Sequence, residues 1–104
     1  MSEFTNVTVV KKANVFFGGN VVSRTVIFED GTKKTLGFIQ PGEYTFNTAA
    51  AEVMEILSGE MEVSIQGQAE KLIIKGEGVF DVPENSSFTM NVTAHADYIC
   101  SFAK

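Results

Sequence analysis

The residues best suited to chemistry gather in the segment 41–60, PGEYTFNTAAAEVMEILSGE. Glu43 and Glu52 supply two carboxylates. The hydrogen-bonding side chains between them are those of Tyr44, Thr45, Asn47 and Thr48. The segment contains no histidine, although transition metals favour imidazole nitrogen as a ligand. We therefore expect these groups to line a site for an organic molecule rather than for a metal ion.

Composition limits the partners of the chain. It has 104 residues, 44% of them hydrophobic, which is enough for one core. We expect a single domain over residues 1–104. The net charge of −5 disfavours binding to nucleic acid or to an anionic membrane, because both surfaces carry negative charge. Any anion that binds must be held by local donors.

Cysteine usage and the N-terminal residues indicate a compartment. The one cysteine, Cys100, has no partner in the chain for a disulfide. The first residues, MSEFTNVTVVKK, lack the basic and apolar regions of a signal peptide. The apolar runs are also far shorter than the roughly 20 residues of a membrane-spanning helix. These features predict a cytoplasmic protein.

The pattern of turns and apolar residues predicts an all-β fold. Runs rich in Val, Ile, Thr and Phe alternate with turn signals such as Asp30-Gly31 and Pro41-Gly42. Alternation of period two places Met61, Val63 and Ile65 on one face of a strand. The same pattern recurs in SFTMNVT and in DYICSFA, where it predicts a buried row of Tyr98, Cys100 and Phe102. The segment 21–39 is expected to be a hairpin that turns at Asp30-Gly31.

The run AAAEVMEIL, residues 49–57, is ambiguous because its residues also favour a helix. In a helix Glu52 and Glu55 would share one face, whereas in a strand they would point to opposite faces. The run is short and lies between strand-like segments. We predict a turn at residues 49–51 followed by a strand.

Motif spacing favours a cupin, a jelly-roll β-barrel, among the all-β folds. Glu52 and Gly59 keep the spacing of the carboxylate and the glycine in the first cupin motif. Thr45 and Asn47 fall where that motif has its two histidines. In the second motif, which Gly78, Pro83 and Asn85 match, Phe88 takes the place of the histidine. The pattern thus predicts a cupin without a metal, and the only histidine, His95, is expected on the surface.

Three longer stretches resemble the small single-domain cupins known as pyrimidine/purine nucleoside phosphorylases. They are FEDGTKKTLGFIQPGEYTFNTAAAEVMEILSGEMEV, GEGVFDVPENSSF and DYICSF. The resemblance implies phosphorolysis of diverse nucleosides to a free base and ribose 1-phosphate, with no metal cofactor. It also implies a cytoplasmic homodimer, a role in nucleotide salvage, and inorganic phosphate as the co-substrate.

This reaction needs a group that stabilises the positive charge formed on the sugar when the glycosidic bond breaks. Glu52 and Glu43 are the catalytic candidates, and Glu52 has the stronger case because of its motif position. Glu43 has an alternative role as a surface residue after the Pro-Gly turn. The leaving base also needs a proton, and Tyr44, Tyr98 and a protonated Glu all remain open as donors.

The substrates need a cation for phosphate and a platform for the base. Lys33 and Lys34 are the basic candidates, of which alternation sends only one inward, and Arg24 is an alternative. Aromatic rings stack on any nucleobase, so they suit broad specificity. The rings on the relevant segments are Tyr44, Phe46, Phe80 and Phe88, with Phe88 preferred because of its motif position. Thr45, Asn47 and Thr48 are expected to bond the ribose or the phosphate.

Two other functions fit the same fold, because fold does not fix function. One is a non-catalytic cupin that binds a small ligand in the same pocket. The other is a metal-dependent cupin enzyme, which the missing histidines disfavour.

Overall fold

A computed structural model describes residues 3–102, and almost every element in it is a strand. The elements are β1 (Thr8–Val9), β2 (Asn14–Phe16), the 3-10 turn η1 (Phe17–Gly19), β3 (Val21–Ile27), β4 (Lys33–Ile39), β5 (Gly42–Asn47), β6 (Glu52–Ile65), β7 (Leu72–Lys75), β8 (Gly78–Val82) and β9 (Ser87–Phe102). This confirms the predicted all-β class. Within residues 3–102, no helix is long and apolar enough to cross a membrane.

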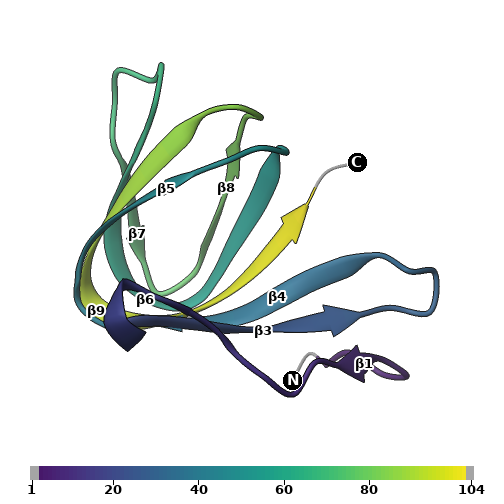
Figure 1. Cartoon of the computed structure of the whole chain (residues 1–104). Coiled ribbons are helices and arrows are strands. Elements are labelled where there is room, and N and C mark those ends of the chain that lie inside the picture. Colours follow the sequence, from purple (N-terminus) through teal and green to yellow (C-terminus); the bar gives the residue numbers. More distant parts are fainter. Residues whose placement is uncertain (1–2, 103–104) are drawn as a thin grey trace.

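The strands form one antiparallel sheet that curls around a core (Figure 1). Its main hydrogen-bonded order is β1-β3-β4-β9-β6-β7, while β2 joins β3, β5 joins β9 and β8 joins β6. The long strands β6 and β9 pair with each other along most of their length. The first half of β9 pairs with β5 and the second half pairs with β4, so the sheet branches along β9. Among the described strands, the hydrogen-bonded order does not close into a ring.

A bend in β6 depends on Gly59. The register of β6 against β9 shifts between Ile56 and Met61, as in a β-bulge. Gly59 lies there with a φ of 122°, and a Cβ atom on it would lie 2.6 Å from the Cβ of Ala96. Only glycine fits this position without displacing β9. The glycine of the first cupin motif therefore has a steric role in the curvature of the sheet.

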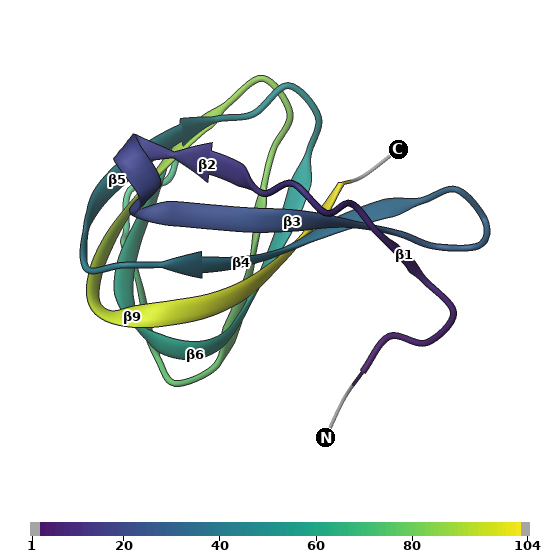
Figure 2. The same cartoon turned by 60° about the horizontal axis from the view of Figure 1, so that its bottom comes forward.

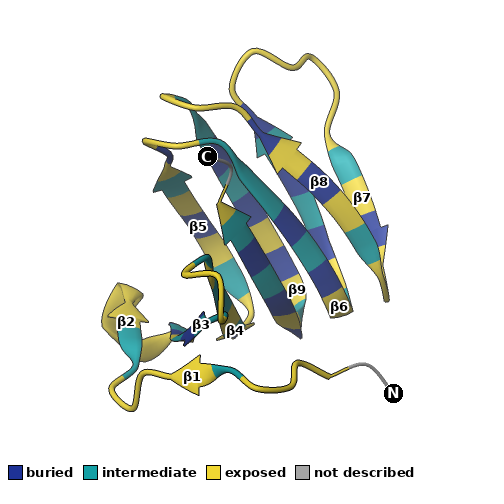
Figure 3. Ribbon diagram, turned by 90° about the vertical axis from the view of Figure 1, so that its right-hand side faces the viewer, coloured by how far each residue is buried: buried dark blue, intermediate teal, exposed yellow. Residues whose placement is uncertain are grey.

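The core follows the predicted alternation. Met61, Val63 and Ile65 on β6 are all buried. Buried and exposed residues alternate as stripes along β8 and β9 in Figure 3. On β9 the prediction is correct for Tyr98 and Cys100 and wrong for Phe102, which is 46% exposed because it ends the last strand beyond the core.

Both local predictions for turns are confirmed. β3 and β4 form an antiparallel hairpin, and Gly31 in its turn has a φ of 87°. The side chain of Asp30 accepts hydrogen bonds from the backbone N–H and the hydroxyl of Thr32, at 3.0 and 2.7 Å. Residues 49–51 lie outside the strands, and β6 begins at Glu52.

The N-terminal segment VTVVKKANVFF is not one continuous strand. It forms two short strands, β1 and β2, which pair with opposite ends of β3. A bend at Lys11 and Lys12 separates them. β2 and η1 lie near β5 in Figure 2, and the ring of Phe17 contacts that of Phe46 at 5.3 Å. The segment thus covers one side of the curled sheet.

Candidate functional site

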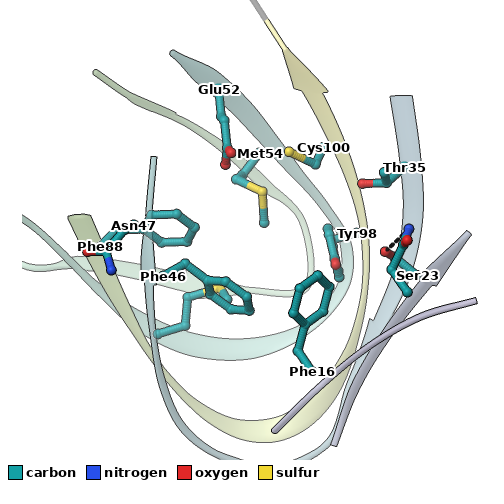
Figure 4. Close-up of a pocket in the computed structure, with 12 residues that line it drawn as sticks. Phe16, Ser23, Thr35, Phe46, Asn47, Glu52, Met54, Phe88, Tyr98 and Cys100 are labelled. Carbon is teal, nitrogen blue, oxygen red and sulfur yellow. Dashed lines mark hydrogen bonds between the residues drawn. The ribbon is translucent and has the colours of Figure 1, made fainter. Parts of the chain in front are cut away.

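A cavity of about 130 Å³ lies inside the curl of the sheet (Figure 4). Strands β2, β3, β4, β5, β6 and β9 all contribute to its walls. Its polar lining consists of Asn14, Ser23, Thr35, Asn47, Glu52, Tyr98 and Cys100. Its apolar lining consists of Phe16, Phe46, Met54, Phe88 and Met90. Polar and aromatic groups therefore face the same space.

Strand register explains how the polar wall forms. Ser23 pairs with Gly37, and Gly37 pairs with Tyr98, so the three residues make one row across β3, β4 and β9. Thr35 and Cys100 pair in the adjacent row. Residues two apart on a strand share a face, so both rows point into the cavity.

Asn14 ties β2 to this wall. Its side-chain Nδ2 donates to the hydroxyls of Ser23 and Thr25, at 3.3 Å each. Figure 4 shows the bond to Ser23 beside Tyr98. The polar groups of β2 and β3 are thus partly satisfied by one another, which lowers the cost of placing them inside the protein.

Glu52 is the one carboxylate in the lining. It begins β6 and points into the cavity on the same face as Met54, while Glu55 lies on the opposite face. Burial raises the pKa of Glu52, and a hydrogen bond with the thiol of Cys100 opposes this shift. Loss of water around the carboxylate is the larger effect, so its protonated form is favoured relative to a carboxyl in water.

Tyr98 and Cys100 lie beside Glu52 and are weak acids. Burial raises the pKa of Tyr98 to about 12, with an opposing hydrogen bond to Ser23. Burial and the negative charge of Glu52 raise the pKa of Cys100 to about 12. Both groups therefore stay protonated near neutral pH and act as neutral hydrogen-bonding partners.

The aromatic wall faces the polar one. The rings of Phe46 and Phe88 stack with centroids 5.7 Å apart and an angle of 23°. Phe16 packs edge-on against Phe46, also at 5.7 Å, and Phe80 packs edge-on against Phe88. Because Phe46 already covers Phe88, the exposed ring surface belongs to this group of rings rather than to Phe88 alone.

The residues predicted from the sequence fall into two sets. Glu52, Asn47 and Phe88 line the cavity. The remaining predicted residues, Glu43, Tyr44, Thr45, Thr48, Lys33 and Lys34, are not part of its lining. Of the open alternatives, Tyr98 lies in the lining and Arg24 does not.

On β5, alternation and hydrogen bonding turn three of these side chains away. Glu43 is exposed, and the hydroxyl of exposed Thr45 is bonded to that of Thr89 at 2.8 Å. Tyr44 is buried in the core, and its hydroxyl donates to the carbonyls of Gln40 and Pro41.

Thr48 follows β5 and bonds to the backbone of the turn before β9. Its hydroxyl donates to the Pro83 carbonyl at 2.7 Å and accepts from the Ser86 N–H at 3.0 Å. It therefore joins two segments of the fold.

The two neighbouring lysines of β4 have different surroundings. Lys34 lies over the rings of Phe4 and Phe28, at 5.8 and 5.9 Å from their centroids. Lys33 is exposed and shares its face of β4 with Thr35, which lines the cavity. Arg24 is exposed on the opposite face of β3 from Ser23 and bonds to the carbonyl of Lys11.

The positions that hold a metal in cupins do not fit one here. Thr45 is bonded to Thr89, and Phe88 is an aromatic ring stacked on Phe46. Only Glu52 offers a strong ligand. Among residues 3–102, no three His, Cys, Asp or Glu side chains come together as a metal site. His95 is exposed on the outer face, with its ring 5.3 Å from that of Phe38.

Comparison with known proteins gives the family. Residues 11–102 match the family model described as pyrimidine/purine nucleoside phosphorylase. The chain belongs to this family. A curated relative of that name from Citrifermentans bemidjiense is 66% identical, over 98% of this chain and 99% of that protein. Another, from Geobacter sulfurreducens, is 62% identical over 98% of each chain. The resemblance predicted from the sequence is confirmed.

Solved structures confirm the cupin fold. A protein of unknown function from Acinetobacter sp. ADP1 is 47% identical, with a TM-score of 0.92 over 97% of this chain and 98% of that one. An RmlC-like cupin from Shewanella frigidimarina has a TM-score of 0.69 at 16% identity, over 97% and 86% of the two chains. The second likeness concerns the fold alone.

Several lining residues were not found from the sequence. These are Asn14, Phe16, Ser23, Thr35, Met54, Met90 and Cys100. One partial signal was present, because Ser23 shares a strand face with the apolar Val21, although Val22 and Val26 on the other face left the inward side undecided. Asn14 and Phe16 carried no such signal, since they come from a short strand at the edge of the sheet.

Gly37 determines the position of Tyr98. A Cβ atom on Gly37 would overlap the Cε1 and Cζ atoms of Tyr98, which lies across the glycine toward Ser23. We expect Gly37→Ala to lower the free energy of unfolding by about 1–3 kcal/mol, as overpacking does in a core. In a Tyr98→Ala background the same change should cost less than about 1 kcal/mol, because the overlap is absent. Urea denaturation of the four proteins measures both values, and equal costs would contradict the steric explanation.

Proposed function

We propose that this protein catalyses phosphorolysis of nucleosides. A nucleoside and inorganic phosphate react to give a free base and ribose or deoxyribose 1-phosphate, so that a pentosyl group passes to phosphate. Family membership supports the reaction class. The observation that carries the proposal is the cavity itself, in which a half-buried carboxyl group faces stacked aromatic rings.

Glu52 is the catalytic residue in this proposal. Its side chain lies in the cavity, where the bond between sugar and base would break. Glu43 is exposed on β5, and we assign it no part in the reaction. The hydroxyl and amide groups of Ser23, Thr35 and Asn47 lie around the same space and can bond the ribose. Thr45 and Thr48 already bond to other parts of the protein and are not assigned to the substrate.

The aromatic wall accounts for the proposed tolerance of both purines and pyrimidines. Phe16, Phe46 and Phe88 offer ring surface and no donors or acceptors that would select one base. Stacking is worth about 1–3 kcal/mol per base and differs little between bases. The proposal needs no metal, since the carboxyl group, the rings and a bound phosphate supply the chemistry.

Phosphate requires a cation that the cavity lining lacks among the described residues. We assign this role to Lys33, which is exposed and shares its face of β4 with Thr35. A lysine within the screening length of about 8 Å can hold an oxyanion despite the net negative charge. Lys34 instead interacts with two aromatic rings.

A second copy of the chain is the proposed partner. Leu36, Phe38 and Leu57 are 40%, 39% and 49% exposed around a groove of about 450 Å³ on the outer face of the sheet. Arg24 and Asp97 lie along the same groove. An apolar centre with one charge of each sign is suited to a two-fold interface, where each cation meets the partner's anion. We further propose that the homodimer acts in nucleotide salvage in the cytoplasm.

The activity is tested by incubating the purified protein with inosine or uridine. We expect free base and ribose 1-phosphate to appear only when phosphate is present, and a chelator to leave the rate unchanged. Ligand-induced thermal stabilisation without turnover would instead indicate a binding protein. A rate that falls on chelation and returns with added metal would contradict metal independence.

The phosphate site is tested by a matched pair of variants. We expect Lys33→Ala to raise the KM for phosphate by about threefold or more, because a nearby cation is lost. Lys34→Ala should leave this KM within about twofold and lower the melting temperature instead, because it removes a cation–π contact. Steady-state kinetics at varied phosphate measures both, and equal effects would remove Lys33 from the site.

The assembly is tested by light scattering. We expect twice the 11.3 kDa mass of one chain for the wild type and the single mass for Phe38→Asp, which places a charge in the apolar groove. Val79→Asp is the control, because Val79 is 64% exposed on β8, outside the groove. A dimeric, folded Phe38→Asp protein would place the interface elsewhere.

A further inference from the structure

We propose that Glu52 acts in its protonated form and donates a proton to the departing base. This inference rests on the proposed phosphorolysis and assigns the acid that the sequence left open among tyrosine and glutamate residues. A carboxyl group at this place has two ways to assist the reaction. It can stabilise the sugar through its negative charge, or it can protonate the base.

The geometry leaves few candidates for the acid. Among residues 3–102, the titratable side chains in the cavity lining are those of Glu52, Tyr98 and Cys100. Tyr44 points its hydroxyl to the carbonyls of Gln40 and Pro41, outside the cavity. His95 is exposed beside Phe38 on the outer face of the sheet.

Acid strength selects Glu52 from the three. A catalytic acid works best when its pKa lies near the working pH. Tyr98 and Cys100 both have a pKa raised to about 12, which makes them poor donors at neutral pH. Loss of water raises the pKa of Glu52 above its ordinary value of 4.5, and Glu52 remains the strongest acid of the three.

The charges around Glu52 favour its protonated form. On β9 it meets Cys100, a neutral thiol, and no cation lies in the described cavity lining. On β5 the polar lining group is the neutral amide of Asn47. On β8 the neighbouring Val82 is uncharged, and the acidic Asp81, on the other face of that strand, lines a surface groove that Glu52 also borders.

Substrate binding adds to this effect. Of the two lysines on β4, only the exposed Lys33 lies on the cavity face of the strand. In the proposed function, bound phosphate neutralises its charge. A phosphate dianion near Glu52 disfavours a second negative charge, as neighbouring carboxylates do in other sites. Binding of phosphate therefore supplies the acid in the form that the reaction needs.

The protons in this step balance with phosphate as the only other reactant. The bond between C1′ of the sugar and the base nitrogen breaks, and its electron pair goes to the base, which takes the proton of Glu52. An oxygen of the hydrogen phosphate dianion, HPO₄²⁻, bonds to C1′. The phosphate then releases its proton to the Glu52 carboxylate. The products are a neutral base and ribose 1-phosphate dianion, and Glu52 is ready for another turnover.

The test compares two substrates that differ in their need for an acid. The base of inosine must be protonated in order to leave. The base of 7-methylinosine already carries a positive charge and leaves without being protonated. We expect Glu52→Gln to lower kcat/KM for inosine by about 100-fold or more and for 7-methylinosine by less than about threefold. Glu55→Gln, on the opposite face of β6, is the control for both. Equal losses with the two substrates would show that the charge of Glu52 acts on the sugar and would overturn the proposal.

The pH profile gives a second measurement that does not need the methylated substrate. For inosine, kcat/KM of the wild type should fall with rising pH through one ionisation, which should be absent in Glu52→Gln. A wild-type rate that instead rises with pH as Glu52 ionises would overturn the proposal. Phosphate-dependent turnover of inosine by the wild type is the separate test of the proposed function, and its failure would remove both.

Protein stability reports the same ionisation without catalysis. Because the pKa of Glu52 is higher in the folded than in the unfolded protein, the folded state binds more protons between the two values. Stability is therefore lost as pH rises above 4.5. Relative to the wild type, Glu52→Gln should therefore become more stable as the pH rises above 4.5. If the difference in unfolding free energy between Glu52→Gln and the wild type did not change with pH, this would contradict the protonated state that the mechanism needs.

Discussion

The antiparallel pairing of β6 with β9 is the constraint on which the site depends. It brings Glu52, at the start of β6, next to Cys100, near the end of β9, although the two are distant in the sequence. The bulge at Gly59 bends β6 so that the sheet curls around both strands. Without this curvature the residues that line the cavity would lie on an open surface, exposed to water. Burial of Glu52, and with it the shift of its pKa, is therefore a consequence of sheet geometry.

The cavity places neutral polar groups on one wall and aromatic rings on the other. Gly37 allows this arrangement, because its missing side chain leaves room for the Tyr98 ring to reach toward Ser23. The thiol, hydroxyl and amide groups can bond a sugar without adding charge. A carboxyl group in such surroundings is easier to protonate than one in water. In the proposed function, a protonated carboxyl group in this neutral pocket acts on an organic substrate, at positions where other cupins place metal-binding histidines.

Strand alternation allowed much of the fold to be read from the sequence. The hairpin at Asp30-Gly31, the turn at residues 49–51 and the buried row on β6 all appear where the pattern predicts them. Alternation failed at Phe102, because it describes the faces of a strand and not how far the core extends along it. Alternation also placed Lys33 and Lys34 on opposite faces of β4, as expected, but it did not show which of them faces the cavity.

By itself, the sequence determined the all-β class, the family and the inward position of Glu52. The class follows from local periodicity, the position of Glu52 follows from motif spacing, and the family follows from resemblance over three long stretches of the chain. Only the tertiary structure decided that Asn14, Phe16, Ser23 and Cys100 share the cavity with Glu52, and that Thr45 and Thr48 do not line it. These residues meet through pairing between distant strands, and the pKa of Glu52 depends on that environment. Alternation along one strand indicates which face is buried, but it does not specify which distant strands pair and so which residues share a cavity.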